Sequence, residues 1–220
     1  MISLYHCERA RSLRVVWTLE EAGLPYQLYS MRFPPRVHSP HFLQENPIGT
    51  VPLMIDGSVR MTESAAICEY LVARYGVPHL ASQPQDPDFG EWLEWLHYGE
   101  ATLTYPLAIA LRWGRMAPPA EQLPQVVEDR LNKFLDRLKP VEACISRREW
   151  LLSKGFTVAD VSVCYALYLA QLLDLTPRLP TAVQDYLQRA QAREGFQRAL
   201  SAWHGEPVAR DPSSTTVAAK

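Results

Sequence analysis

The sequence predicts a small α/β domain followed by an all-helical domain. Short strand-like and helix-like segments alternate over the first 76 residues, and strand-like segments disappear after a stretch rich in proline, glutamine, serine and aspartate. We therefore place the α/β domain at residues 1–77, a linker at 78–88 and the helical domain at 89–204. Residues 205–220 are small and polar, and we expect them to be disordered.

The predicted α/β domain has the order βαβ, an irregular segment, and ββα. Strands are predicted at Ile2–Tyr5 and Tyr26–Met31, and the helix between them starts after Ser12, which is a favourable N-cap. Residues 51–61 form a predicted hairpin, and a helix follows that ends at Gly76. A βαβ unit implies a parallel strand pair with a right-handed crossover.

Five segments after the linker have the apolar spacing of helices. They are Asp88–Trp113, Glu121–Ser146, Val158–Leu173, Ala182–Ala192 and Phe196–Trp203. Pro140 is expected to kink the second of these helices. Thr157 and Asp160 have the spacing of a capping box at the start of the third.

Composition and charge exclude several classes of partner. The net charge of -2 gives no electrostatic reason to expect nucleic acid or an anionic membrane. The longest apolar run, Val161–Leu173, is shorter than the roughly 20 residues that span a bilayer. The four cysteines are scattered without metal-ligand spacing, so we expect reduced thiols, no metal site and a cytoplasmic protein.

Two motifs in the first domain suggest a binding site. Asn46-Pro47-Ile48-Gly49-Thr50-Val51-Pro52 precedes the hairpin, and Pro52 cannot donate a ladder hydrogen bond. A cis Val51-Pro52 bond would present the backbone of Val51 to a ligand, whereas the alternative is a plain turn. Thr62-Glu63-Ser64 precedes a helix, whose N-terminal N–H groups can bind an anion unless Ser64 is only an N-cap.

These motifs, in this order, resemble the cytosolic glutathione transferase family from Met1 to about Trp203. Four segments carry the resemblance: Leu19–Tyr26, Asn46–Pro52, Glu63–Ile67 and Thr157–Asp160. The resemblance implies a thioredoxin-like N-terminal domain that binds glutathione as co-substrate, a C-terminal helical bundle that supplies the pocket for a hydrophobic acceptor, and a homodimer. It implies that the enzyme transfers the glutathione thiolate to small hydrophobic electrophiles.

The resemblance also assigns glutathione contacts. Val51, next to Thr50 and with Pro52 in cis, is expected to pair with the cysteinyl backbone of glutathione. Ser64 is expected to hold the γ-glutamyl carboxylate and Glu63 its ammonium. His38 is expected to bind the glycyl carboxylate, with Arg36 as the alternative. For the acceptor pocket, the candidates are Tyr98, Tyr105, Leu111 and Trp113, which are otherwise core residues.

The residue that activates the thiol is left open. A free thiol has a pKa of about 8.5 and reacts as the thiolate, so a donor or a positive charge is needed near the sulfur. The family uses a Tyr, Ser or Cys near the end of the first strand, and this chain departs from that pattern. The candidates, in order of preference, are Ser12, Arg11 (or Arg9), Tyr5 and Cys7.

Other functions on the same scaffold remain alternatives. One is a different glutathione-dependent enzyme, namely an isomerase, dehalogenase, peroxidase or a thiol transferase that uses Cys7. Another is a non-catalytic binding protein of the same fold.

Overall fold

A four-stranded sheet forms the α/β part of the computed structural model, which describes residues 1–202. The strand order is β2-β1-β3-β4. Strand β1 (Ile2–Cys7) pairs parallel with β2 (Tyr26–Met31) and antiparallel with β3 (Leu53–Asp56), which pairs antiparallel with β4 (Val59–Met61). The predicted βαβ unit and hairpin are confirmed, except that β3 starts after Pro52 and β1 continues to Cys7.

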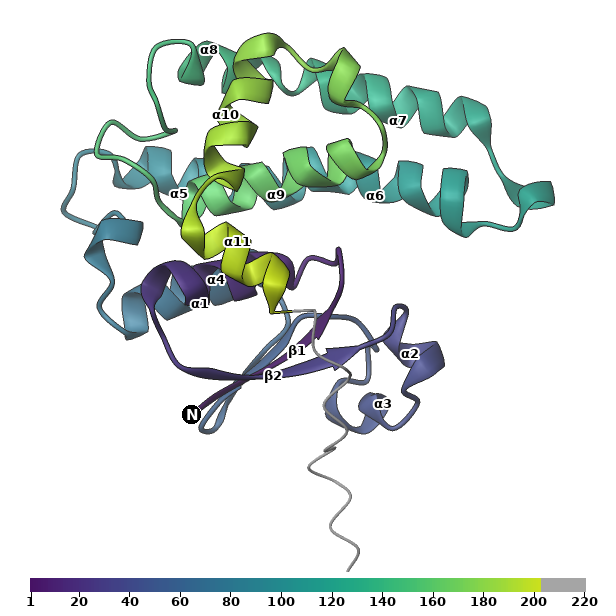
Figure 1. Cartoon of the computed structure of the whole chain (residues 1–220), viewed down its shortest axis with the longest axis horizontal. Helices are drawn as coiled ribbons and strands as arrows, with labels where there is room; N and C mark the ends of the chain where they lie inside the picture. The colour runs from purple at the N-terminus through teal and green to yellow at the C-terminus, as the bar shows by residue number, and fades with distance from the viewer. Residues whose placement is uncertain (203–220) are drawn as a thin grey trace, which may run out of the picture.

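Helices α1 (Leu13–Ala22) and α4 (Ser64–Arg74) pack against each other between the sheet and the helical part (Figure 1). Helix α1 is followed by Gly23, whose left-handed backbone (φ 62°) suits glycine. The segment expected to be irregular contains two short helices, α2 (Pro35–His38) and α3 (Phe42–Glu45). One helical turn shows no periodicity, so the sequence could not predict them.

The helical part begins with a continuous helical segment in four pieces. These are α5 (Phe89–His97), the π-helix η2 (Tyr98–Thr104), α6 (Tyr105–Leu111) and the π-helix η3 (Arg112–Met116). The remaining helices are α7 (Pro124–Asp136), α8 (Lys139–Ile145), α9 (Val158–Leu172), α10 (Thr181–Gln191) and α11 (Glu194–Ser201). Short 3-10 turns lie at η1 (Pro78–Leu80), η4 (Pro119–Glu121) and η5 (Thr176–Arg178).

The expected kink at Pro140 is wrong. The segment predicted as one helix is two helices, α7 and α8, and the break precedes Lys139. Pro140 therefore lies in the first turn of α8, where a missing N–H costs no helical hydrogen bond.

Helix α9 is the core of the helical part, and nearly all of its side chains are buried. The predicted capping box is confirmed: Thr157 Oγ1 accepts from the Ala159 N–H at 3.2 Å, and Asp160 Oδ2 accepts from the Thr157 N–H at 2.8 Å. The second carboxylate oxygen of Asp160 accepts from the Leu151 N–H and the Tyr186 hydroxyl, so the buried carboxylate fixes the loop before α9.

Helix α11 returns to the α/β part and lies beside α1 (Figure 1). Arg193, just before α11, donates two hydrogen bonds of 2.8 Å to the Glu21 carboxylate. Phe196 packs edge-on against Trp17 with ring centroids 4.8 Å apart. Trp203 and the tail expected to be disordered lie outside the described residues. Within residues 1–202, no helix combines the length and the apolar character that crossing a membrane requires.

Candidate functional site

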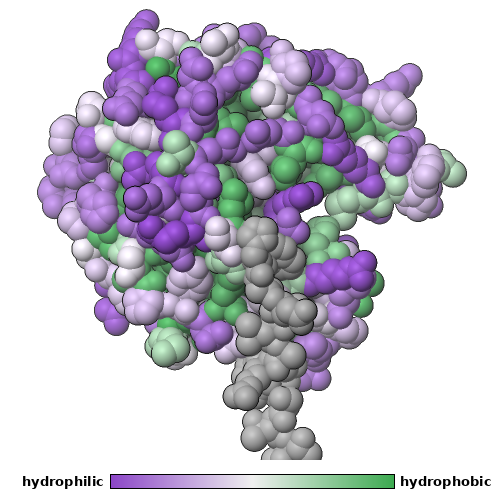
Figure 2. All heavy atoms as spheres, viewed as in Figure 1, coloured by the Kyte–Doolittle hydropathy of each residue, from purple (hydrophilic) through white to green (hydrophobic). Residues whose placement is uncertain are grey.

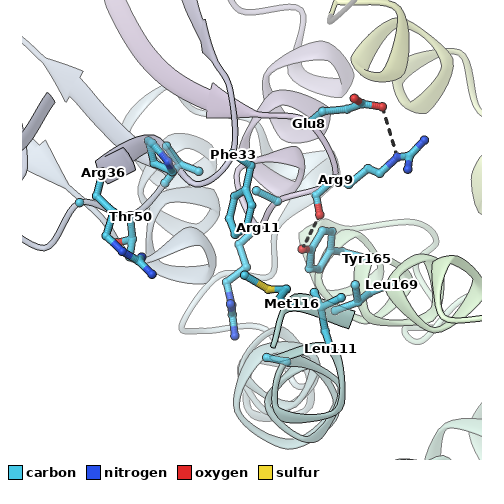
Figure 3. A pocket seen from close by; sticks show the side chains of 15 residues that line it. Glu8, Arg9, Arg11, Phe33, Arg36, Thr50, Leu111, Met116, Tyr165 and Leu169 are labelled. Atoms are coloured by element: carbon cyan, nitrogen blue, oxygen red, sulfur yellow. Dashed lines mark hydrogen bonds and ion pairs between the residues drawn. The ribbon is translucent and has the colours of Figure 1, made fainter. Parts of the chain in front are cut away.

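A cavity of about 380 Å³ lies between the α/β part and the helical part. Figure 2 shows the surface hollowed between these two parts, and Figure 3 shows the lining from close by. The α/β part contributes Glu8, Arg9, Ala10, Arg11, Phe33, Pro35, Arg36, Gly49, Thr50 and Val51. The helical part contributes Ala108, Leu111, Met116, Tyr165 and Leu169. One wall is therefore polar and cationic, and the opposite wall is apolar.

The charge on the lining favours an anion. Arg9, Arg11 and Arg36 line the cavity, and Glu8 is the acid among its lining residues. Glu8 Oε1 lies 3.2 Å from Arg9 Nε, so this carboxylate is already paired. Arg36 and Thr50 lie on one side of the cavity and Arg9 and Tyr165 on the other (Figure 3).

The turn between β1 and α1 presents the arginines. The Ala10 N–H donates to the Cys7 carbonyl at 3.2 Å, and Arg9 adopts a left-handed backbone with φ 60°. The Arg9 carbonyl accepts a hydrogen bond of 3.3 Å from the Tyr165 hydroxyl, which comes from α9. Burial raises the pKa of Tyr165 to about 12, so this hydroxyl stays a donor at neutral pH. The turn is thereby fixed to the helical wall of the cavity.

Ser12, the first candidate for thiol activation, does not line the cavity and is fully buried. Its Oγ lies 2.9 Å from His6 Nδ1 and accepts from the Cys7 N–H at 3.4 Å. The interpretation of Ser12 as a side-chain N-cap is wrong, because its side chain makes no cap hydrogen bond to α1. Its hydroxyl instead joins the end of β1 to the start of α1.

Tyr5 and Cys7 also lie away from the cavity lining. Tyr5 is buried, with its ring stacked on Tyr29 at 4.9 Å and tilted against Phe42 at 5.2 Å. Cys7 is fully buried, and burial raises the pKa of its thiol to about 12. A thiol with this pKa is protonated at neutral pH and is a poor nucleophile.

Arg11 is the candidate that the structure brings to the cavity. Its side chain is 38% exposed, and its Nε lies 2.6 Å from Glu100 Oε1. Glu100 belongs to the π-helix η2, so the contact crosses from the α/β part to the helical part.

The Asn46–Pro52 loop brings Thr50 and Val51 to the cavity. Asn46 holds the loop by donating from Nδ2 to the Thr50 carbonyl at 2.8 Å and accepting from the Ile48 N–H at 3.2 Å. The predicted cis Val51-Pro52 bond is confirmed. Among the described residues, the backbone of Val51 pairs with no other loop or turn.

Gly49 cannot be replaced in this loop without a clash. Its φ is 66°, and a Cβ built there would lie 2.8 Å from the Arg36 Cβ and 2.9 Å from Leu43 Cδ2. The loop therefore packs directly on α2 and α3 and brings Arg36 next to Thr50.

Glu63 and Ser64 begin α4 but do not line the cavity. Ser64 is the first helical residue and Glu63 occupies the N-cap position without a side-chain cap hydrogen bond. The Ser64 Oγ accepts from Arg14 Nη1 at 3.2 Å and is almost fully buried, whereas Glu63 is exposed. The uncapped N-terminus of α4 leaves N–H groups that an anion can accept.

Of the two cations proposed for the glycyl carboxylate, Arg36 lines the cavity and His38 does not. Of the residues proposed for the acceptor pocket, Leu111 lines the cavity, whereas Tyr98, Tyr105 and Trp113 do not. The Tyr98 hydroxyl donates to the Arg137 carbonyl instead. Within residues 1–202, no group of three His, Cys, Asp or Glu side chains is placed to hold a metal ion.

Arg14 is a central residue that the sequence analysis missed. Its side chain is fully buried, and its guanidinium lies 4.2 Å from the centroid of the Tyr165 ring. It donates to Glu100 Oε2 at 2.5 Å and to Thr104 Oγ1 at 2.6 Å. It also donates to the carbonyls of Gly99 and Ser162. An arginine within the apolar run of α1 was the available signal, because a buried charge requires a partner.

Comparisons with known proteins give the family. The family model described as "Glutathione S-transferase, N-terminal domain" matches residues 1–73. The probable glutathione S-transferase GSTF2 of Oryza sativa subsp. japonica is 32% identical over 197 residues, which cover 82% of this chain and 88% of that relative. The chain belongs to the glutathione S-transferase family.

Solved glutathione transferases have the same fold as this one. The structure of a glutathione transferase from Methylococcus capsulatus is 26% identical with a TM-score of 0.77, over 92% of this chain and 98% of that chain. The glutathione transferase URE2P8 from Phanerochaete chrysosporium, crystallised with oxidized glutathione, has a TM-score of 0.80 at 22% identity, over 92% of this chain and 94% of that chain. The expected thioredoxin-like domain followed by a helical part is thus confirmed.

Proposed function

We propose that this glutathione transferase conjugates the glutathione thiolate to small hydrophobic electrophiles. The observation that carries the proposal is the composition of the cavity lining. The lining combines Val51, three arginines and an apolar wall from α6 and α9. Glutathione bound along Val51 places its thiol between a cationic surface and an apolar one. The first stabilises a thiolate and the second accommodates an apolar acceptor.

Arg11 is the proposed activating residue. A positive charge close to the sulfur stabilises the thiolate by about 1.4 kcal/mol for each unit of pKa that it removes. Arg11 lines the cavity, whereas Ser12, Tyr5 and Cys7 are buried away from it. Arg9 and Arg11 each pair with a carboxylate, but the Arg9 side chain is 64% exposed and the Arg11 side chain 38%. The field of Arg9 is therefore screened more strongly by water and salt.

The remaining glutathione contacts follow from the family. Thr50, Val51 and cis Pro52 would hold the cysteinyl backbone, and Arg36 would bind the glycyl carboxylate. Glu63, Ser64 and the N-terminus of α4 would hold the γ-glutamyl group. We include a homodimer and a cytoplasmic location in the proposal, in keeping with the resemblance.

The test is a thiolate absorbance titration of the glutathione complex of the wild type, Arg11→Ala and Ser12→Ala. We expect bound glutathione in the wild type to ionise below its free pKa of about 8.5. Arg11→Ala should restore the free value, and Ser12→Ala should keep the wild-type value. A return to the free value in Ser12→Ala alone would contradict the assignment of Arg11.

A non-catalytic glutathione-binding protein is the second candidate. The observation in its favour is that no tyrosine, serine or cysteine of the β1–α1 segment reaches the cavity. Glutathione that binds with an unchanged thiol pKa in the wild type, together with no conjugation of an electrophilic chloroarene, would establish this second function.

A further inference from the structure

We propose that Glu100 is a positioning residue, which holds the Arg11 guanidinium so that its terminal amino groups face the cavity. The inference rests on the proposed role of Arg11. It adds a residue from the helical part to thiol activation, for which all the candidate residues named above belong to the α/β part.

The two oxygens of Glu100 bind two different arginines. Oε1 lies 2.6 Å from Arg11 Nε, and Oε2 lies 2.5 Å from Arg14 Nη1. Because Glu100 takes the Nε of Arg11, the two terminal amino groups of Arg11 are left over. In the described part of the chain, neither of them donates to a protein acceptor. A bound anion is the natural partner for two such donors.

Glu100 is itself held in place by the other half of this arrangement. Arg14 is fully buried and donates to Thr104 Oγ1 and to the Gly99 carbonyl within η2. It also donates to the Ser162 carbonyl of α9. The Glu100 carboxylate therefore pairs with a cation that is held by burial and by hydrogen bonds to two helical segments, and it can hold the partly exposed Arg11 in turn.

The backbone before Glu100 is fixed as well. Gly99 packs so closely on α9 that a Cβ built there would lie 2.5 Å from the Ser162 carbonyl carbon. π-helical segments of this kind often occur at functional sites. Here the π-helix η2 directs the Gly99 carbonyl and the Thr104 hydroxyl towards one guanidinium, and Glu100 towards two.

Two possible roles of Glu100, as a nearby negative charge or as a positioning residue, predict opposite changes in the thiol pKa of bound glutathione when Glu100 is removed. Burial by itself would raise the pKa of Glu100, but the charges of Arg14 and Arg11 hold that pKa below its ordinary value, so the carboxylate is ionised. If Glu100 acted only as a charge, its loss would leave two unscreened arginines and would lower the thiol pKa further. If Glu100 positions Arg11, its loss lets the guanidinium turn away, and the thiol pKa rises.

The experiment measures the thiol pKa of bound glutathione in Glu100→Gln, Arg11→Ala and the double variant. We expect Glu100→Gln to lose at least half of the wild-type depression of the thiol pKa. In the Arg11→Ala background, Glu100→Gln should have no further effect. A lower or unchanged thiol pKa in folded Glu100→Gln would overturn the positioning role.

Arg11→Lys is the second variant, because Glu100→Gln leaves Arg14 without its counter-ion and reduces stability. Lysine keeps the charge, but its single ammonium cannot bind Glu100 through one nitrogen and face the cavity with two others. We expect Arg11→Lys to lose most of the thiol pKa shift at an unchanged melting temperature. Full retention of the shift would overturn the inference. A wild type without any shift would instead refute the proposed function.

Discussion

Arg14 and Glu100 form an ion pair of 2.5 Å that joins α1 to the π-helix η2, and the arginine side chain is fully buried. Arg14→Met leaves Glu100 paired with Arg11, but it removes the buried donors to Thr104 Oγ1 and to the Gly99 and Ser162 carbonyls. Because a hydrogen bond to a charged group contributes about 1.5–3 kcal/mol, we expect this variant to lower the free energy of unfolding by about 3 kcal/mol or more in urea titrations. Arg115→Met is the matched control, because its pair with Asp174 is exposed and should change stability by less than about 1 kcal/mol.

Burial of Asp160 predicts a pH dependence of stability. Burial raises the pKa of this carboxyl from 3.8 to about 6, so the native state binds more protons than the unfolded state between these two values. The contribution of Asp160 to stability therefore falls as the pH rises through this window, by roughly 3 kcal/mol in total. In Asp160→Asn this contribution is absent, so urea titrations from pH 4 to 7 should show stability rising more steeply with pH than in the wild type.

Burial of His6 affects the pH dependence of stability in the opposite direction, so His6 provides the control for Asp160. Burial lowers the pKa of His6 from 6.5 to about 4, so the unfolded state binds more protons between these values and stability rises with pH. The two slopes offset each other in the wild type. His6→Asn should consequently show stability that falls as the pH rises from 4 to 6. A rise in this variant would contradict the assignment.

The cysteines should differ in their rate of alkylation. Burial raises the pKa of all four thiols, but Cys7, Cys68 and Cys164 are fully buried, whereas Cys144 is half-buried and can be reached by a reagent. We expect iodoacetamide to label Cys144 first in the native protein, as read by peptide mass spectrometry. Labelling in urea should make the four rates similar. Preferential labelling of Cys7 would revive the thiol transferase alternative.

Arg36 and His38 offer a matched pair for glutathione binding. Both belong to α2, but Arg36 lines the cavity and His38 does not. A hydrogen bond to a charged group contributes about 1.5–3 kcal/mol, so Arg36→Ala should weaken glutathione binding by about tenfold or more in calorimetry. His38→Ala should keep the wild-type affinity. The reverse result would restore His38, the original choice from the sequence.

Local sequence patterns predicted much of the fold. The alternation of strands and helices and the Thr157–Asp160 capping box depend on neighbouring residues, and the structure confirms both. The cis Val51-Pro52 bond is also confirmed, but the local sequence left a plain turn open, and the family resemblance decided between the two. The same patterns misled the analysis at Ser12. A serine before a helix is typical of an N-cap, but its hydroxyl contacts His6 and Cys7 instead.

The parts that sequence reasoning missed depend on contacts between distant residues. Arg14 donates hydrogen bonds to Gly99, Glu100 and Ser162, which lie in two other helical segments. No local pattern in the sequence identifies these residues as its partners. The predicted helix at 88–113 is likewise observed as α5, η2, α6 and the start of η3. The π-helix η2 contacts α9 through Gly99 and Arg14 through Thr104, and both partners lie far from it in the sequence.

The contacts of Arg14 make the α/β half a poor candidate for a chimaera with the helical half of a relative. Four of the residues that receive its hydrogen bonds, Gly99, Glu100, Thr104 and Ser162, come from the helical half. A chimaera that joins this half to the helices of a relative would contain the buried Arg14 side chain without its hydrogen-bond acceptors from the helical half. We expect such a graft to fold only where the donor helices carry an acid and two free carbonyls at the matching places, so the two halves should be exchanged together.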